Sequence, residues 1–285
     1  MNGLRQPASV VPPSRVAGRR QALAEWMLAQ WRKTVDRRSD QLQRTIPEIF
    51  MTDPRPTLRL MRSTGAVDYP AAVRFMEREA NLIANGEQPE LIWFLEHPPL
   101  LTKGTRGRAE HLVDAGRFPV FETDRGGEIT YHGPGQRIIY TLLDVRRRAD
   151  GDVRAFVRLL ERCVIGALDR LGVTATSDPA RPGVWVHRAD LSGGEAKIGA
   201  LGLKVRRGVS LHGISVNVDP DLSHFATIVA CGLEGSAITS LAALGAVADF
   251  ESVDNALIAS VTEHLGPLTV VPDSEVGAAD GGLTP

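Results

Sequence analysis

The chain has 285 residues, of which 43% are apolar and 24% are charged, and its formal net charge is −1. This composition is typical of a globular protein and excludes the disordered, collagen-like and disulfide-scaffold classes. The longest run without a charged residue, 235–248, has 14 residues. A membrane-spanning helix needs about 20 residues, so we expect no membrane partner. A net charge near zero also argues against nucleic acid as a partner.

The chain contains two cysteines, Cys163 and Cys231. So few cysteines indicate a reducing compartment rather than a secreted fold held by disulfides. We therefore predict a cytoplasmic location and no disulfide between the two thiols.

The first 50 residues differ in charge from the rest of the chain. They carry nine Lys or Arg and four Asp or Glu, and apolar residues recur at helical spacing over 21–41. An import presequence would be amphipathic and Arg-rich, but it would also be poor in acidic residues. We favour a poorly ordered basic extension at 1–50, with Met51 as a natural start. One folded domain at 51–272 and a flexible tail at 273–285 would follow.

From residue 58 onward the hydrophobic pattern alternates between strand and helix periods. Apolar runs of strand length predict strands at 58–61, 91–95, 136–143, 183–187, 198–205 and 209–218. Apolar residues at helical spacing predict helices at 69–84, 153–171 and 254–265, and Gly172 ends the second of them. The short link at 206–208 predicts an antiparallel hairpin. We therefore predict an α+β fold with a mixed, mainly antiparallel sheet flanked by helices.

Residues 125–136 read Arg-Gly-Gly-Glu-Ile-Thr-Tyr-His-Gly-Pro-Gly-Gln. Glycine lets a ligand approach the backbone closely, and the free N–H groups of such a segment can bind it. The pattern matches neither a phosphate-binding loop nor a dinucleotide fingerprint. The alternative is a solvent-exposed double turn with one incidental histidine, because little in the segment suggests a core.

The predicted hairpin at 196–217 combines a lysine with small residues. Lys197 precedes a strand that contains Gly199 and Gly202, and the return strand carries a polar set that includes His212 and Asn217. Glycine weakens a strand unless another group needs the space, which points to a cavity. The alternative is a lysine at a strand end that extends into water.

The two cysteines have different surroundings in the sequence. Cys231 follows an apolar run and precedes Gly232, as expected for a thiol held at an accessible turn, although a buried inert thiol is an equal alternative. Cys163 lies on the apolar side of its predicted helix, where a cysteine behaves as a small hydrophobe. The spacing of the seven histidines suggests no metal site.

These motifs occur in one order: the 125–136 segment, Gly-Val-Trp-Val at 183–186, Lys-Ile-Gly-Ala-Leu-Gly at 197–202, the 212–217 strand and Cys231-Gly232. From about residue 58 to 265 the chain resembles the lipoyl(octanoyl) transferases of the biotin and lipoate protein ligase superfamily. Two departures are visible. Ala230 stands where the family usually has proline, and Gly199 and Ser215 stand where alanine is common.

The resemblance implies a catalytic domain of the biotin/lipoate protein ligase type at 51–272. It also implies a two-step transfer of octanoyl from octanoyl-acyl carrier protein to Cys231 and then to a lysine of lipoyl domains. The acceptors would be 2-oxoacid dehydrogenase complexes and the glycine cleavage H protein. Lys197 would act with Cys231, without cofactor or metal, and we expect a monomer. The substrate-contact segments map to Arg125, Gly126, Gly127, Glu128, Ile129, Thr130, Tyr131 and His132, to Ala200, Leu201 and Gly202, and to Gly213, Ile214 and Ser215.

The chemistry agrees with the residues present. A thiol of pKa about 8.5 is only about 3% thiolate at pH 7, and lowering this pKa by about two units requires roughly 2.7 kcal/mol. One ammonium about 4 Å away supplies up to about 4 kcal/mol at an effective dielectric constant of 20. His132 could donate to the thioester oxygen or orient the thioester. An ATP-dependent ligase and a non-catalytic lipoyl- or biotin-binding module remain alternatives.

Overall fold

The computed structural model describes residues 55–191, 193–229, 237–246 and 249–273. The predicted extension at 1–50, Met51 and the tail from 274 lie outside the described residues, as do Ala230 and Cys231. The chain divides after Pro54, and all described residues belong to the unit Arg55–Pro285.

Within the described residues, eight strands form the main sheet in the order β11-β1-β2-β6-β10-β9-β8-β7. The strands are β1 (Leu58–Ala66), β2 (Leu91–Glu96), β6 (Gln136–Leu142), β7 (Ala175–Asp178), β8 (Arg181–His187), β9 (Glu195–Arg206), β10 (Val209–Asn217) and β11 (Leu268–Val271). The strand β1 pairs in parallel with β2 and β11, and the other neighbours pair antiparallel. The predicted mixed, mainly antiparallel sheet is confirmed.

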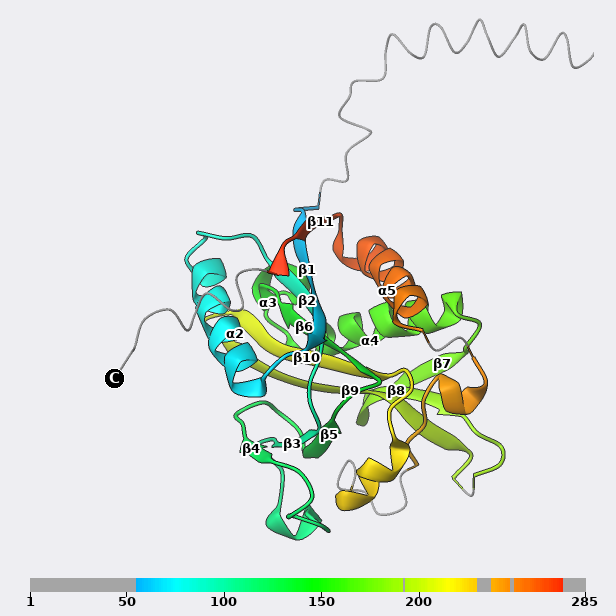
Figure 1. Cartoon of the computed structure of the whole chain (residues 1–285). Coiled ribbons are helices and arrows are strands. Elements are labelled where there is room, and N and C mark those ends of the chain that lie inside the picture. The colour runs from blue at the N-terminus through cyan, green and yellow to red at the C-terminus, as the bar shows by residue number, and fades with distance from the viewer. Residues whose placement is uncertain (1–54, 192, 230–236, 247–248, 274–285) are drawn as a thin grey trace, which may run out of the picture. The chain divides into compact units, whose positions relative to one another are not determined.

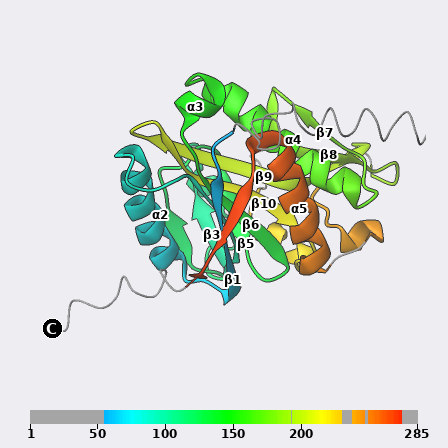
Figure 2. The same ribbon diagram turned by 90° about the horizontal axis from the view of Figure 1, so that it is seen from above.

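Helices cover both faces of this sheet (Figures 1 and 2). They are α2 (Tyr69–Ala84), α3 (Val145–Ala149), α4 (Val153–Arg170) and α5 (Phe250–Leu265). The helix α2 packs on the face that carries Trp93, and α4 and α5 pack on the face that carries Ile92 and Phe94. Alternate residues of a strand point to opposite faces, so β2 contributes to two cores, as its continuous apolar sequence predicted. None of the helices in the described segments is both long and apolar enough for a bilayer span.

Aspartates begin all four of these helices. Asp68, Asp144, Asp152 and Asp249 accept hydrogen bonds from backbone N–H groups in the first turns of α2, α3, α4 and α5. Each carboxylate satisfies donors that have no partner within the helix. The predicted bounds of α2 are confirmed, whereas α5 begins four residues earlier than predicted, because its capping residue is Asp249.

A second sheet lies beside the main one and has the order β4-β3-β5, with β3 (Leu100–Lys103), β4 (Val120–Glu122) and β5 (Ile129–His132). The interpretation that little in the 125–136 segment could form a core was therefore wrong for residues 129–132. Ile129 and Tyr131 alternate along β5 and are 2% and 0% exposed, and with Leu101 they form a separate apolar cluster. This strand is too short to show its period in the sequence, which is why the flanking glycines dominated the prediction.

The predicted hairpin joins β9 and β10 and forms the centre of the site. Its turn residues Arg207 and Gly208 both have positive φ angles, 54° and 88°, as in the two-residue turns that match the twist of a hairpin. His212 in β10 also has a positive φ, 61°. A Cβ atom at Gly213 would lie 2.1 Å from the backbone oxygen of Ile139. Gly213 therefore serves the close approach of β6 to β10.

Candidate functional site

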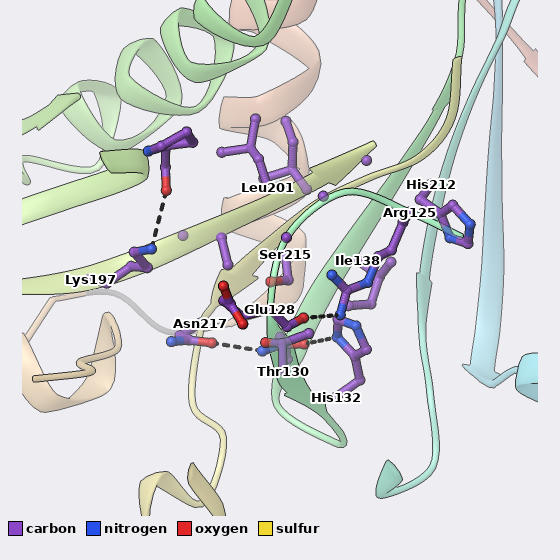
Figure 3. A pocket seen from close by; sticks show the side chains of 18 of the residues that line it. Arg125, Glu128, Thr130, His132, Ile138, Lys197, Leu201, His212, Ser215 and Asn217 are labelled. Atoms are coloured by element: carbon purple, nitrogen blue, oxygen red, sulfur yellow. Dashed lines mark hydrogen bonds between the residues drawn. The ribbon is translucent and has the colours of Figure 1, made fainter. Parts of the chain in front are cut away.

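A cavity of about 300 Å³ lies between the β9–β10 hairpin and the segment at 125–132. Its other walls come from β6, from the start of β8 and from the N-terminal residue of α2. This volume is at the lower end of the range of small-molecule sites. Figure 3 shows Lys197 at one end of the cavity and Arg125 and His212 at the other.

Most of the predicted site residues line this cavity. They are Arg125, Gly127, Glu128, Ile129, Thr130, His132, Lys197, Ala200, Leu201, Gly202, Gly213, Ile214 and Ser215. The 125–132 segment and the β9–β10 hairpin, which are far apart in the sequence, therefore meet at one cavity. The cavity lining does not include Gly126 or Tyr131, and the placement of Cys231 lies outside the described residues.

Gly126 and Tyr131 make contacts that hold the walls of the cavity in place. The backbone N–H of Gly126 donates to the oxygen of Leu203 at 2.8 Å, which fixes the 125–128 turn to β9. The side chain of Tyr131 packs against Phe225, and its hydroxyl lies 2.7 Å from Nδ1 of His224. Both residues hold the small sheet in place.

Lys197 is buried, with 7% exposure. Its Nζ donates to the backbone oxygen of Pro182 at 3.1 Å and lies 4.6 Å from the ring centroid of Trp185. This cation–π contact stabilises the ammonium in the cavity wall. Within the described residues the ammonium forms no close ion pair, and the carboxyl of Glu161 is near enough to interact with its charge. The alternative of a lysine that extends into water is therefore wrong.

Gly183 makes room for this lysine. Its φ is +138°, and a Cβ atom there would lie 2.8 Å from Cε of Lys197. Its backbone N–H donates to Oε1 of Glu161 at 2.9 Å. Burial raises the pKa of Glu161, and the hydrogen bond from Gly183 acts in the opposite direction. A larger residue at 183 would displace the lysine side chain.

Arg125 provides a second buried cation, at the other end of the cavity. All of its hydrogen bonds within the described residues go to uncharged oxygens of Thr102, Gly126 and Glu128, at 2.7–3.2 Å. Burial lowers the pKa of this guanidinium. The side chain therefore ties β3 to the 125–128 turn, and the carboxylate of Glu128 interacts with its positive charge without a hydrogen bond to it.

Gly202 is small because of this arginine. A Cβ atom at Gly202 would lie 3.0 Å from the backbone oxygen of Gly126 and 3.1 Å from Cδ of Arg125. Glycine weakens a strand, but at position 202 it allows the 125–128 turn to pack directly on β9.

Near this end of the cavity, His132 and His212 interact with the charge of Arg125, and the ring centroid of His97 lies 6.1 Å from that of His132. All three histidines are uncharged at neutral pH. Burial lowers the pKa of His97 to about 4, that of His132 to about 3 and that of His212 to about 4. The positive charge of Arg125 acts in the same direction on His132 and His212. Imidazolium would need solvation that this end of the cavity does not supply.

Two tyrosines complete this end of the cavity. The hydroxyl of Tyr140 lies 2.7 Å from Nε2 of His97, whose Nδ1 lies 2.7 Å from the backbone oxygen of Val67. Since a carbonyl only accepts, Nδ1 carries the proton and Tyr140 donates to Nε2. The buried hydroxyl of Tyr69 has no hydrogen-bond partner in the described residues. This end of the cavity is therefore polar.

Sequence reasoning did not assign several lining residues to the site. These include Tyr69, Gln136, Ile138, Tyr140, Trp185 and Asn217. Five of them stand in strands whose order in the sheet joins distant parts of the chain. Tyr69 occupies the first position of α2, where the sequence shows only the start of a helix. In the described part of the chain, no group of three or more His, Cys, Asp or Glu residues could hold a metal.

The second cysteine, Cys163, is buried in α4, and its burial raises the thiol pKa to about 12. A thiol with such a pKa is unreactive at neutral pH. The prediction that Cys163 belongs to the core is confirmed.

A family model described as the lipoyl protein ligase A/B catalytic domain matches residues 68–262. The chain is 50% identical over 222 residues to an octanoyltransferase of Nitrobacter winogradskyi, covering 77% of this chain and 95% of that protein. It is 52% identical over 210 residues to one of Jannaschia sp., covering 72% and 97%. The chain belongs to the octanoyltransferase family. Octanoyltransferases are acyltransferases, so this membership identifies the chain as an enzyme.

Solved structures support the same fold for this octanoyltransferase-family chain. A bipartite lipoate protein ligase from Thermoplasma acidophilum has a TM-score of 0.59 at 19% identity, covering 78% of this chain and 89% of that one. Lipoate-protein ligase A bound with ATP has a TM-score of 0.58 at 19% identity, covering 79% and 92%. The predicted lipoate protein ligase fold is confirmed.

Proposed function

We propose that this chain transfers an octanoyl group from octanoyl-acyl carrier protein to a lysine of a lipoyl domain, through a thioester on Cys231. One observation carries the proposal: the buried ammonium of Lys197, which forms no close ion pair in the described residues, lies at one end of a cavity of about 300 Å³. In a family of octanoyltransferases, a cysteine thiolate is an anion that such an ammonium would stabilise.

Backbone contacts of the described residues support the pairing of Lys197 with Cys231. The N–H of Lys197 donates to the oxygen of Ala237 at 2.9 Å, and the N–H of Thr239 donates to the oxygen of Lys197 at 3.0 Å. Ala237 stands six positions after Cys231 in the sequence. The chain that follows the cysteine is thus hydrogen-bonded to the lysine's own strand.

Both steps balance without a cofactor. The Cys231 thiolate attacks the thioester carbonyl, the bond to the carrier sulfur breaks, and the carrier leaves as a thiol after taking up a proton. The neutral amine of the acceptor lysine then attacks the new thioester, an amide bond forms, and Cys231 leaves as the thiolate. The proton lost by the amine passes to the medium. The first step exchanges one thioester for another, so it needs no ATP.

The proposal predicts the fate of each thiol in an intact-mass experiment with octanoyl-acyl carrier protein. Wild-type protein should gain one octanoyl group, and Cys231→Ser should gain none. Cys163→Ser is the matched control and should still be acylated, because that thiol lies in the core. Acylation of Cys231→Ser, or transfer that requires ATP and forms an adenylate, would contradict the proposal. Ligand binding without any acylation would favour a binding module instead.

The role of Lys197 is tested by the thiol pKa, measured from the pH dependence of iodoacetamide alkylation. Lys197→Met should raise the pKa of Cys231 by about two units, because the stabilising ammonium is lost. Lys197→Arg retains a cation and should raise this pKa by less. An unchanged thiol pKa in Lys197→Met would refute the assigned role while leaving Cys231 as the nucleophile.

A further inference from the structure

A chain of hydrogen bonds runs along one wall of the cavity, through three strands. Nδ2 of Asn217 donates to the backbone oxygen of Thr239 at 2.9 Å. Nε2 of Gln136 donates to Oδ1 of Asn217 at 2.9 Å, and Oε1 of Gln136 lies 2.7 Å from Nδ1 of His132. Figure 3 shows the links from Asn217 to His132 as dashed lines. Gln136 and Asn217 are 1% and 5% exposed, and Thr239 is fully buried.

The direction of this chain is fixed by its last member. The backbone oxygen of Thr239 can only accept, so the group of Asn217 that faces it is the amide NH₂. The carbonyl of Asn217 then faces Gln136 and must receive an N–H from it. The carbonyl of Gln136 consequently faces His132, and Nδ1 of His132 must carry the proton.

The tautomer of His132 follows from this direction. A neutral imidazole has one N–H, so Nε2 of His132 carries a lone pair. The ring is neutral because it is buried among His97, Arg125 and His212, whose charges and dipoles disfavour a second proton. Nε2 makes no hydrogen bond within the described residues, and His132 lines the cavity. In its resting state His132 therefore offers the cavity a hydrogen-bond acceptor.

We propose that Gln136 and Asn217 are positioning residues that hold His132 in the Nδ1–H tautomer, so that its Nε2 accepts a hydrogen bond from an N–H group of the substrate. This inference rests on the proposed function, and it excludes donation from Nε2 to a thioester oxygen. Two N–H groups would pass through the site: the amide nearest the thioester of the donor's prosthetic arm, and the amine of the acceptor lysine.

The tautomer is tested first, without any measurement of activity. In ¹⁵N-edited NMR spectra of the folded wild-type protein, His132 should show a protonated Nδ1 and an unprotonated Nε2. Gln136→Leu removes the acceptor and should convert this signal to a mixture of tautomers. A protonated Nε2 in the wild type, or an unchanged tautomer in Gln136→Leu, would overturn the proposal. Because this readout needs no substrate, it stands even if octanoyl transfer is not found.

The role of Nε2 is tested with His132→Asn. The asparagine NH₂ can still donate to Gln136, but the acceptor at the position of Nε2 is removed. Loss of one hydrogen bond between uncharged groups should slow the step that uses it about tenfold. His132→Gln extends an amide to that position and should restore part of the rate. His187 is exposed on β8, and His187→Asn is the matched control, with no change expected in either step.

Two half-reactions distinguish the N–H groups. Slower acylation by octanoyl-acyl carrier protein, with unchanged acylation by an octanoyl thioester of ethanethiol, would assign the hydrogen bond to the amide of the donor. Slower transfer from the preloaded enzyme to the lipoyl domain, with unchanged acylation, would assign it to the acceptor amine. If acylation by the ethanethiol thioester, which has no N–H group, slows as much as acylation by the carrier protein and transfer to the lipoyl domain, the proposal is overturned.

Gln136→Glu provides a pH readout that a merely structural role would not give. A carboxylate beside Nδ1 should raise the pKa of His132 by about one to three units, because it stabilises the imidazolium. His97, Arg125 and His212 face the same ring and act in the opposite direction. The titration of the His132 ring, followed by NMR, should shift upward by the same amount, and an unshifted titration would count against the proposal.

Discussion

Mild acid should destabilise this fold through His97, His132 and His212. Their pKa values are about 4, about 3 and about 4 in the folded protein for His97, His132 and His212, against about 6.5 in the unfolded chain. Below about pH 6.5 the unfolded chain binds more protons than the folded one, so stability falls as the pH falls. Lowering the pH from about 7.5 to about 5.5 should cost about 1.4 kcal/mol per histidine, or about 4 kcal/mol in total.

Urea unfolding followed by circular dichroism at several pH values measures this loss. His212→Asn is the informative variant, because asparagine tolerates the left-handed backbone at this position. It should lose about one third of the pH dependence over this range. The buried carboxyls of Glu161 and Asp254, whose pKa values are raised, change stability in the opposite direction. The difference between the variant and the wild type removes their contribution. Equal pH dependence in both proteins would refute the reasoning.

Three further substitutions test other parts of the structure. Gly213→Ala places a Cβ atom 2.1 Å from the oxygen of Ile139 and should cost about 3 kcal/mol in urea unfolding. Tyr69→Phe removes a buried hydroxyl without a partner in the described residues and should raise the free energy of unfolding by about 1 kcal/mol in the same assay. Arg137→Met leaves Asp254, which Arg137 approaches at 2.8 Å, without its most buried partner, and should lower stability by about 3 kcal/mol in thermal unfolding. An unchanged stability in any of them would contradict the corresponding contact.

The sequence predicted the helices and strands that are long enough to repeat their hydrophobic period several times. The helix at Tyr69–Ala84 and the hairpin of β9 and β10 follow directly from apolar spacing and from a short Gly-containing link. The strands β3, β4, β7 and β11 escaped prediction, since each has only three or four residues. A run of that length cannot establish a period of two. The segment at 129–132 was misinterpreted for the same reason.

The candidate site could be predicted only where glycine or an isolated charge stands out from its surroundings. Lys197 did so, whereas Arg125 was assigned through the family resemblance, and both line the cavity. Tyr140 is an ordinary strand residue in the sequence, and it comes to line the cavity because β6 lies beside β10. That neighbourhood arises from sheet order, which no local pattern specifies.

The chain of hydrogen bonds at His132 ends at a main-chain oxygen, that of Thr239, and this has a consequence for engineering. A side chain can be replaced, whereas the carbonyl remains whichever amino acid occupies position 239. Substitutions at Gln136 or Asn217 can break this chain of hydrogen bonds. No residue chosen at position 239 can reverse its donor-to-acceptor direction, because the terminal acceptor is the backbone oxygen. Redesign of the imidazole as a donor would therefore require a different backbone path.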